Sequence, residues 1–286
     1  MASRIYTLLA TLLFIFPKDL ISQEPYLSNT DKQLFNTYAT YIAQYEAEQM
    51  GTILEKTAEF FLKTPYVGGT LDQNEDERLV INFSEMDCVT YVENVIALSL
   101  AVHNHNLSQA VFMDNLKQIR YRKKEIVDYS SRIHYTSDWI FENQKNNLLE
   151  NISEKLGGKK ETKQINFMSS HQSAYKQLAN DYVMLDKIAQ SEKIINNRGG
   201  FYYLPKNLID EKAKDIPHMS VIGIVTAIPG LDTSHVGFAY HKDRKLTFIH
   251  ASSLKMEVII DEKTLSEYCL SQKNCKGVIV ARVKDK

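Results

Sequence analysis

Hydrophobic positions in the first third of the chain recur at helical spacing. Between residues 30 and 63 they form two successive stripes, which predict two amphipathic helices on one side of a core. A third, buried helix is predicted to begin at Cys88, because the short carboxylate of Asp87 can accept the first free backbone N–H groups as an N-cap. The helix-spaced apolar residues behind it are Val89, Val92, Val95, Ile96 and Leu100.

The middle of the chain, residues 107–185, predicts helices and loops without internal repeats. Ser108 is the predicted N-cap of one helix, and residues 171–188 have the pattern of another. The segment Asn196-Asn197-Arg198-Gly199-Gly200 is a strong turn signal, because paired glycines adopt backbone conformations closed to other residues.

The last part of the chain changes to short β-rich runs separated by turns, which is typical of an antiparallel meander. Helices first and a sheet afterwards indicate an α+β fold. The predicted strands cover residues 221–225, 234–240, 246–251, 257–260 and 278–283.

The first 22 residues have the pattern of a signal peptide. Arg4 supplies a positive charge, and residues 5–16 (IYTLLATLLFIF) form an apolar run too short for a transmembrane helix, which needs about 20 residues. Cleavage near Ser22 would release a periplasmic or secreted protein that is not inserted in a membrane. An uncleaved membrane anchor is the alternative.

Composition and charge narrow the class of protein. A hydrophobic content of 44% over 286 residues is enough for a full core. The formal net charge of −1 gives no electrostatic reason to expect nucleic acid as a partner. Of the three cysteines, Cys269 and Cys275 could form a local disulfide or could both be reduced core residues. A disulfide would leave Cys88 as the free thiol.

Cys88 is a candidate nucleophile. A thiol in the first turn of a helix faces the positive end of the helix dipole, which is expected to lower its pKa and to increase the thiolate fraction. The alternative is a small buried core residue, a common place for cysteine.

Two histidines in the predicted meander supply the partner that such a thiol needs. A hairpin turn centred between Lys242 and Asp243 would put His235 directly opposite His250, on the same face of the sheet. A one-residue slip would separate the two side chains. In the predicted register His235 can act as the general base and then acid, while His250 orients it. Each histidine alone would more simply be an ordinary core or surface residue.

Four motifs together resemble the NlpC-type papain-like cysteine hydrolases of bacterial cell walls. They are Pro65-Tyr66-Val67-Gly68-Gly69, Asp87-Cys88, Ser234-His235-Val236-Gly237 and Ile249-His250-Ala251-Ser252.

The resemblance implies that Cys88 is the nucleophile, His235 the base and His250 the polar residue of the following strand. It also places Tyr66 near the nucleophile, and the backbone N–H of Cys88 would help to form an oxyanion hole. It implies neither a metal nor an organic cofactor. The expected domain covers residues 23–286, with N-terminal helices packed on the C-terminal antiparallel sheet.

Cys88 and His235 are much farther apart in sequence than in compact members of that family. Residues 103–215 should therefore form a large, mostly helical insertion that shapes the substrate cleft. This insertion, together with the motifs, resembles the N-acetylmuramoyl-L-alanine amidase-like branch. The resemblance implies a monomer that cleaves the amide between N-acetylmuramic acid (MurNAc) and L-Ala in peptidoglycan fragments (muropeptides).

Five residues of the insertion are candidates for substrate contact, although a segment for capping and core packing has the same pattern. An arginine can clamp a carboxylate of the stem peptide, and a tryptophan can stack on a sugar. His103 and His105 lack convincing zinc-site spacing, so no metal site is predicted. The candidates are Arg132, His134, Asp138, Trp139 and Arg198.

Two other functions remain open. A D,L-endopeptidase would use the same chemistry on a bond within the stem peptide. A non-catalytic cell-wall binding module would simply bury Cys88.

Overall fold

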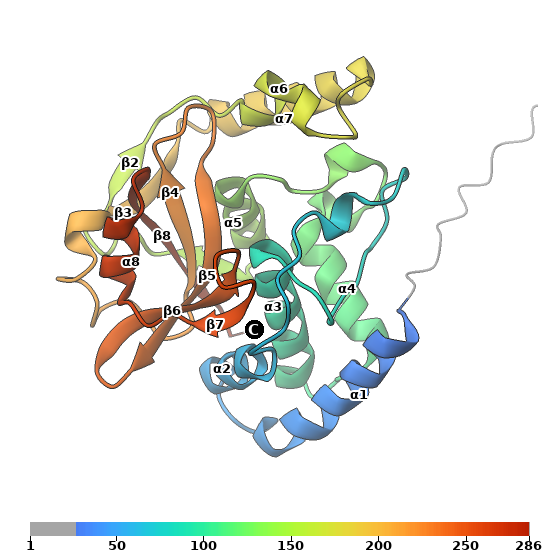
Figure 1. Cartoon of the computed structure of the whole chain (residues 1–286), viewed down its shortest axis with the longest axis vertical. Helices are drawn as coiled ribbons and strands as arrows, with labels where there is room; N and C mark the ends of the chain where they lie inside the picture. The colour runs from blue at the N-terminus through green and yellow to red at the C-terminus, as the bar shows by residue number, and fades with distance from the viewer. Residues whose placement is uncertain (1–26, 286) are drawn as a thin grey trace, which may run out of the picture.

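A buried helix, α3 (Cys88–His103), lies at the centre of the computed structural model, which describes residues 27–285 (Figure 1). The predicted signal peptide, residues 1–22, lies outside this range. Helix α3 packs between the sheet on one side and helices α2 (Met50–Phe60) and α4 (Gln109–Arg120) on the others. It begins at Cys88 with Asp87 as its N-cap, as the sequence predicts.

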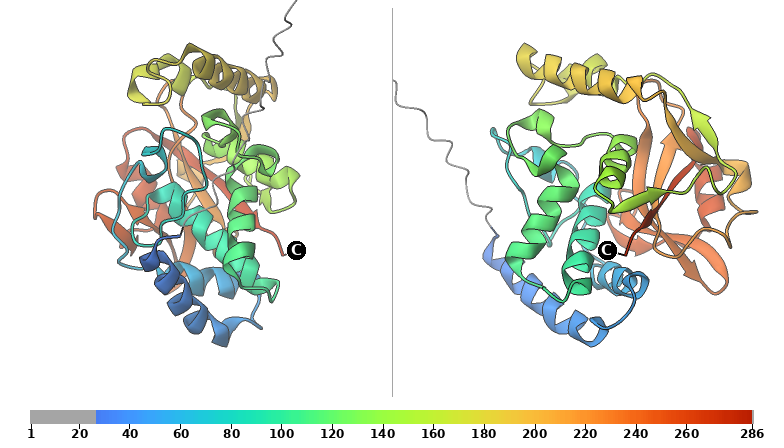
Figure 2. Two further views of the ribbon diagram at one scale, coloured as in Figure 1. Left: turned by 90° about the vertical axis from the view of Figure 1, so that its right-hand side faces the viewer. Right: turned by 180° about the vertical axis from the view of Figure 1, so that it is seen from behind.

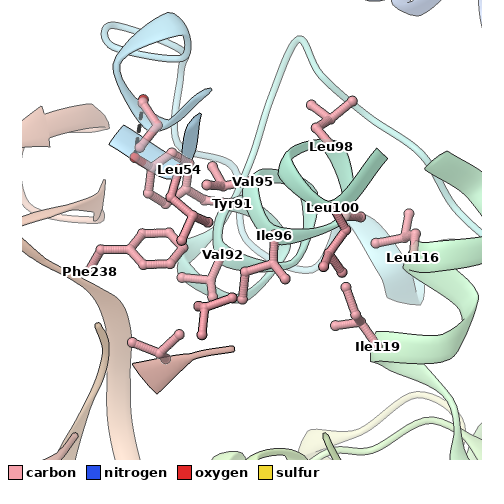
Figure 3. Close-up of a cluster of buried hydrophobic side chains, with 14 of the residues drawn as sticks. Leu54, Tyr91, Val92, Val95, Ile96, Leu98, Leu100, Leu116, Ile119 and Phe238 are labelled. Atoms are coloured by element: carbon pink, nitrogen blue, oxygen red, sulfur yellow. Dashed lines mark hydrogen bonds between the residues drawn. The ribbon is translucent and has the colours of Figure 1, made fainter. Parts of the chain in front are cut away.

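Apolar side chains surround α3 on nearly every side, as expected for a helix that is hydrophobic all round. Figure 3 shows Leu54 of α2 and Phe238 of the sheet on one side, and Leu116 and Ile119 of α4 on the other. Each fully buried aliphatic or aromatic side chain contributes roughly 1.5–3 kcal/mol. The position of the N-terminus of α3 is therefore fixed by the packing of the whole helix.

One buried ion pair lies within this core. The Arg120 guanidinium of α4 donates through Nε to Glu93 of α3 at 2.6 Å, and through Nη1 to the Val80 carbonyl at 2.6 Å. Both charged side chains are about 2% exposed. A buried carboxylate is tolerated only when it is paired and hydrogen-bonded, so this contact fixes the register of α4 on α3.

The two predicted N-terminal helices are confirmed, but the position predicted for one helix of the middle segment is wrong. Residues 30–63 form α1 (Asn29–Ile42) and α2, and Ser108 caps α4. The helix predicted at residues 171–188 instead occupies α7 (Tyr182–Asn197), because the Asp181 carboxylate accepts the Met184 N–H and starts the helix later. The remaining helices are α5 (Thr136–Lys145), α6 (Phe167–Ser170) and α8 (Leu265–Ser271).

An antiparallel sheet covers the other side of α3, so the predicted α+β fold is confirmed. Its order is β2-β3-β8-β4-β5-β6-β7, with β1 also paired to β8. Helices α2, α3 and α4 lie on one face, and α8 lies on the opposite face (Figure 1). All five strands predicted in the last part of the chain are present. They are β4 (Val221–Thr226), β5 (Thr233–Lys242), β6 (Lys245–Ser252), β7 (Glu257–Ile260) and β8 (Cys275–Val283).

The predicted insertion contributes strands as well as helices. Strand β1 (Leu149–Asn151) pairs with one end of β8, and β3 (Phe201–Pro205) pairs with the other end. Strand β2 (Lys159–Glu161) extends the sheet beyond β3. Helices α6 and α7 (yellow) lie together at the top of the molecule in both views of Figure 2. The insertion is therefore partly built into the sheet.

The predicted register of the β5–β6 hairpin is wrong by two residues. Lys242 pairs with Lys245, and Phe238 pairs with Ile249. Asp243 and Arg244 form the two-residue turn with φ values of 49° and 65°, as a type I′ hairpin requires. The predicted turn was centred one residue earlier in the chain. The observed turn requires a positive φ at Arg244, and arginine rarely adopts one.

A two-residue shift keeps His235 and His250 on the same face, since side chains alternate with a period of two. Continuing the ladder by one residue puts Gly237, not His235, opposite His250. A Cβ at Gly237 would lie 2.8 Å from the His250 Cβ and 2.7 Å from the Phe248 ring. The absence of a side chain at Gly237 therefore leaves room for His250 to reach diagonally toward His235.

Replacing Gly237 with alanine should destabilise the protein by about 1–3 kcal/mol, because the new methyl group overlaps the β6 backbone and two of its side chains. The matched control is Gly51→Ala in α2, where no heavy atom lies within 4 Å. That substitution should be neutral or stabilise the helix by up to about 1 kcal/mol. Urea unfolding of both variants measures the difference. Equal effects of the two substitutions would contradict the packing argument.

Candidate active site

Cys88 is held at the first position of α3 by a capping box. The Asp87 carboxylate accepts the N–H groups of Val89 and Thr90 at 3.1 and 2.8 Å, and the Thr90 hydroxyl accepts the Asp87 N–H at 2.9 Å. These reciprocal bonds fix the backbone on both sides of the cysteine. Cys88 has intermediate exposure as a residue, although its thiol is enclosed enough for burial to raise its pKa.

His235 of β5 and His250 of β6 form a hydrogen-bonded pair. Nε2 of His235 lies 2.6 Å from Nδ1 of His250, and the two rings are perpendicular. The Phe248 ring stacks on His250 with a centroid distance of 4.5 Å. His250 is 1% exposed, so this packing holds its ring in one orientation. The contact predicted from the sequence is present, but in the diagonal geometry.

Backbone N–H groups converge on the sulfur of Cys88. The N–H of Val236, the residue after His235, faces the sulfur and helps to lower the pKa of the thiol, as do the N–H groups of Cys88 and Val89. The thiol therefore lies against the start of β5. The structure thus brings Cys88, His235 and His250 together from one helix and two strands.

The pKa of the Cys88 thiol differs from the expectation based on the helix dipole. Burial first, and then the Asp87 carboxylate, raise it to about 12, although three backbone N–H groups act in the opposite direction. The expected lowering by the helix terminus is therefore wrong, because burial and the capping carboxylate both oppose a thiolate.

His235 is buried. Burial first, and then the neighbouring His250, lower the pKa of its imidazole to about 3. Its ring is therefore neutral at neutral pH, which is the state that a general base must have before it accepts a proton.

A carboxylate beyond His250 has no signal in the sequence. Asp261, directly after β7, has Oδ2 3.5 Å from Nε2 of His250. Burial opposes its charged form, but the contact with His250 and the Lys263 backbone N–H outweigh burial, so the pKa of Asp261 is lowered. Only the pairing of β7 with β6 brings this side chain to His250, which is why local pattern could not reveal it.

Two tyrosines flank the site. Tyr66, which the sequence predicts near Cys88, has its pKa raised to about 12 by burial and by the nearby Cys88 and Asp87. Tyr268 of α8 lies edge-on to His250, with ring centroids 5.6 Å apart. Its neighbour Cys269 forms a disulfide with Cys275 of β8, so one of the two alternatives for these cysteines is realised. Cys88 is the free cysteine.

Two hollows of different size adjoin these residues. A cleft of about 900 Å³ is lined by His235, His250, Asp261 and Tyr268. A pocket of about 20 Å³ lies between α3 and the start of α5, beside Val236, and His134 and Trp139 line it. The residues that line the large cleft lie outside the insertion, whereas insertion residues line the small pocket. That the insertion shapes the substrate cleft stays a prediction.

Comparison with known proteins identifies the family. The profile of the AmiA-like family, described as N-acetylmuramoyl-L-alanine amidase-like, matches residues 56–278, which include every residue of the site. The chain belongs to this AmiA-like family. No curated protein gives a significant match.

Solved structures include other proteins similar to this AmiA-like chain. An N-acetylmuramoyl-L-alanine amidase from Bacteroides uniformis is 35% identical, with a TM-score of 0.75 over 83% of this chain and 100% of that one. A candidate xylanase from Bacteroides fragilis is 34% identical, with a TM-score of 0.75 over 79% and 98%. A Legionella pneumophila protein at 22% identity, with a TM-score of 0.68 over 89% and 96%, shares the fold.

Three of the five predicted substrate contacts in the AmiA-like chain are engaged in ion pairs. The buried Asp138 carboxylate binds Arg122 and also Arg198, the latter at 2.5 Å. Arg198 also binds Glu142 at 3.0 Å. These contacts hold α5 to the end of α7. Asp138 and Arg198 also line a separate hollow, so their contact with a substrate stays a prediction.

Arg132 is likewise engaged in ion pairs, and its contact with a substrate stays a prediction. It is 6% exposed, pairs with Asp72, and lies 3.6 Å from Glu77. Spacing alone could not reveal these partners, because they come from a loop about sixty residues earlier in the chain. Only His134 and Trp139 line a hollow beside the site.

Residues 27–285 contain no group of three or more His, Cys, Asp or Glu side chains arranged to hold a metal ion. Within the same range, no helix is both long and apolar enough to cross a membrane.

The buried neutral His235 should make the protein sensitive to acid. Its pKa is about 3 when folded and about 6.5 when unfolded, so between these values only the unfolded chain binds the proton. His235 alone should reduce the free energy of unfolding by roughly 1.4 kcal/mol for each pH unit below 6.5. Urea unfolding at several pH values between 7 and 4 measures how the free energy of unfolding changes with pH. This dependence should be weaker in His235→Asn than in the wild type, by the equivalent of about one bound proton. An identical dependence in the two proteins would show that His235 titrates normally.

Proposed function

We propose that the protein is a cysteine-dependent N-acetylmuramoyl-L-alanine amidase. Its substrates would be muropeptides, and the bond cleaved would be the amide between the MurNAc lactyl group and L-Ala. One observation carries this proposal: His235 is hydrogen-bonded to His250, and the backbone N–H of the next residue, Val236, faces the sulfur of the free Cys88. Membership of the AmiA-like family and similarity to a named amidase support a peptidoglycan hydrolase.

The first chemical step forms a thioester. The Cys88 sulfur attacks the carbonyl carbon of the amide while its proton moves to Nδ1 of His235. The carbonyl oxygen becomes an oxyanion, which the backbone N–H of Cys88 and the Tyr66 hydroxyl are suited to stabilise. The C–N bond then breaks, and the departing amine takes the proton from His235.

The second step returns the enzyme to its starting state. A water molecule attacks the thioester carbonyl carbon and gives a proton to Nδ1 of His235. The C–S bond breaks, and the sulfur regains that proton. The sum of both steps is one amide and one water converted to a carboxylic acid and an amine.

The two hollows suit the two sides of the scissile amide. His235 protonates the leaving amine and lines the large cleft, so we assign that cleft to the stem peptide. The Lys255 and Lys263 side chains line it and can attract the carboxylates of such a peptide. The small pocket beside Val236 has room for about one water-sized group, so we assign it to the lactyl methyl. In this arrangement His134 and Trp139 contact the substrate.

Mass spectrometry of digested muropeptides tests which bond is cleaved. The wild type should release an intact stem peptide that begins with L-Ala. Cys88→Ala should release none, and His235→Ala should lose about 10²- to 10⁴-fold in rate. The exposed His171→Ala, at a histidine far from the site in the insertion, is the matched control and should cleave at the wild-type rate.

The alternatives give different products. Fragments that retain L-Ala on the sugar would indicate a D,L-endopeptidase. Binding without any product, unchanged in Cys88→Ala, would indicate a cell-wall binding module.

We further propose that the protein is exported to the periplasm or beyond and acts there as a monomer. The N-terminal pattern of residues 1–22 and the Cys269–Cys275 disulfide support an oxidising compartment.

Terminal sequencing of protein recovered from a periplasmic fraction should find a new N-terminus near Ser22. An Arg4→Glu change in the charged region should reduce export and leave full-length protein in the cytoplasm. Full-length protein recovered from the membrane fraction would instead indicate an uncleaved anchor.

A further inference from the structure

We infer that Asp261 is a positioning residue that acts through His250 and sets the tautomers of both site histidines, so that His235 presents an unprotonated nitrogen to Cys88. This inference rests on the proposed hydrolase function only for its effect on rate. The effect on the two rings can be measured without any substrate.

Asp261 is held firmly where β7 ends. Its backbone N–H donates to the Phe248 carbonyl at 2.8 Å, and its own carbonyl accepts the Thr247 hydroxyl at 2.6 Å. Its Oδ1 accepts the Lys263 N–H at 2.8 Å. One carboxylate oxygen is therefore occupied by the turn, and Oδ2 remains directed at His250.

Whether Nε2 of His250 carries the imidazole proton depends on this carboxylate. The nitrogen is buried, and among the described residues it has no regular hydrogen-bond partner. The Asp261 Oδ2 at 3.5 Å is the charged group that it faces. A carboxylate can only accept a hydrogen bond, so the favourable arrangement places the imidazole proton on Nε2 of His250.

The tautomer of His250 decides that of His235. With its proton on Nε2, neutral His250 has a lone pair on Nδ1 and must accept the 2.6 Å hydrogen bond between the rings. His235 then carries its own proton on Nε2, as the donor. Its Nδ1 is left with a lone pair, which is the state required to accept the thiol proton of Cys88.

The opposite tautomer would inactivate the site. If His250 carried its proton on Nδ1, it would donate to Nε2 of His235. The His235 proton would then be on Nδ1, directed at the thiol, and no base would be available. Without a carboxylate beside Nε2, little distinguishes the two arrangements, because the bond between the rings is made in both.

The carboxylate also suits the charged stage of the reaction. When His235 takes the thiol proton, it becomes an imidazolium with His250 as its acceptor. Polarisation of His250 by the Asp261 charge strengthens that acceptor. Removal of the charge should therefore lower kcat and leave KM little changed, since Asp261 is expected to act on the ring pair and not on the ground-state substrate.

Two substitutions and a matched control test the inference. In Asp261→Asn and Asp261→Ala, kcat for muropeptide cleavage should fall by about 10- to 100-fold, as is common when a group that orients a functional histidine is removed. Asp243→Asn removes an exposed carboxylate at the tip of the β5–β6 hairpin and should leave kcat unchanged. Urea unfolding of each variant verifies that it is folded.

A double-substitution cycle separates positioning from a general structural effect. In a His250→Gln background, Asp261→Asn should produce no further loss of kcat, because the ring through which it acts is absent. An equal fold-loss in both backgrounds would overturn the inference.

Nitrogen-15 NMR of histidine-labelled, substrate-free protein reads the tautomers directly. The wild type should show Nε2-protonated rings for both His235 and His250, and Asp261→Asn should show Nδ1-protonated forms. Unchanged tautomers in Asp261→Asn would overturn the inference, whatever the activity. If the tautomers shift as expected but the wild type cleaves no muropeptide, the proposed function fails and the role of Asp261 in setting the tautomers stands.

Discussion

The packing of α3 against the sheet is the contact on which the rest of the site depends. The helix is buried on nearly all sides, and its first residue lies against the backbone of β5. The thiol is therefore placed by the summed packing of a whole helix, with the Asp87 capping box fixing only the last details. A reactive group on a rigid element keeps its geometry better than one on a loop.

The site concentrates features that oppose folding. It contains a neutral histidine whose pKa is near 3, a thiol whose pKa is raised, and a buried imidazole Nε2 without a regular hydrogen-bond partner. Burial costs each of these groups its hydration. The surrounding core of α2, α3, α4 and the sheet provides the stability that offsets these costs, which is common where function requires a strained arrangement.

Local secondary structure could be predicted well from the sequence. The Asp87 cap, the start of α3 and the five C-terminal strands depend on residues close in the chain, and all are present. The hairpin register was harder to predict from the sequence, because it depends on Arg244 adopting a positive φ, which its residue type does not favour.

Contacts between segments that are distant in the sequence were the hardest to predict. Asp261 reaches His250 only because β7 pairs with β6, and an aspartate after a strand has no distinguishing local pattern. Arg132 and Asp138 have side chains that could equally bind a ligand or another residue, and only the folded chain shows their partners. The same limit explains why the three strands of the mostly helical insertion were not predicted: they are short and depend on β8 and on each other for pairing.

The bond between Cys269 and Cys275 also affects how the chain acquires its native state. The two residues are six positions apart, whereas Cys88 is far from both in sequence. Closing a short loop costs less chain entropy than closing a long one, so an unfolded chain under oxidation should join these two sulfurs before either captures Cys88. Proximity in sequence thus protects the thiol of Cys88, the nucleophile that we propose, from mispairing before the core around it has formed.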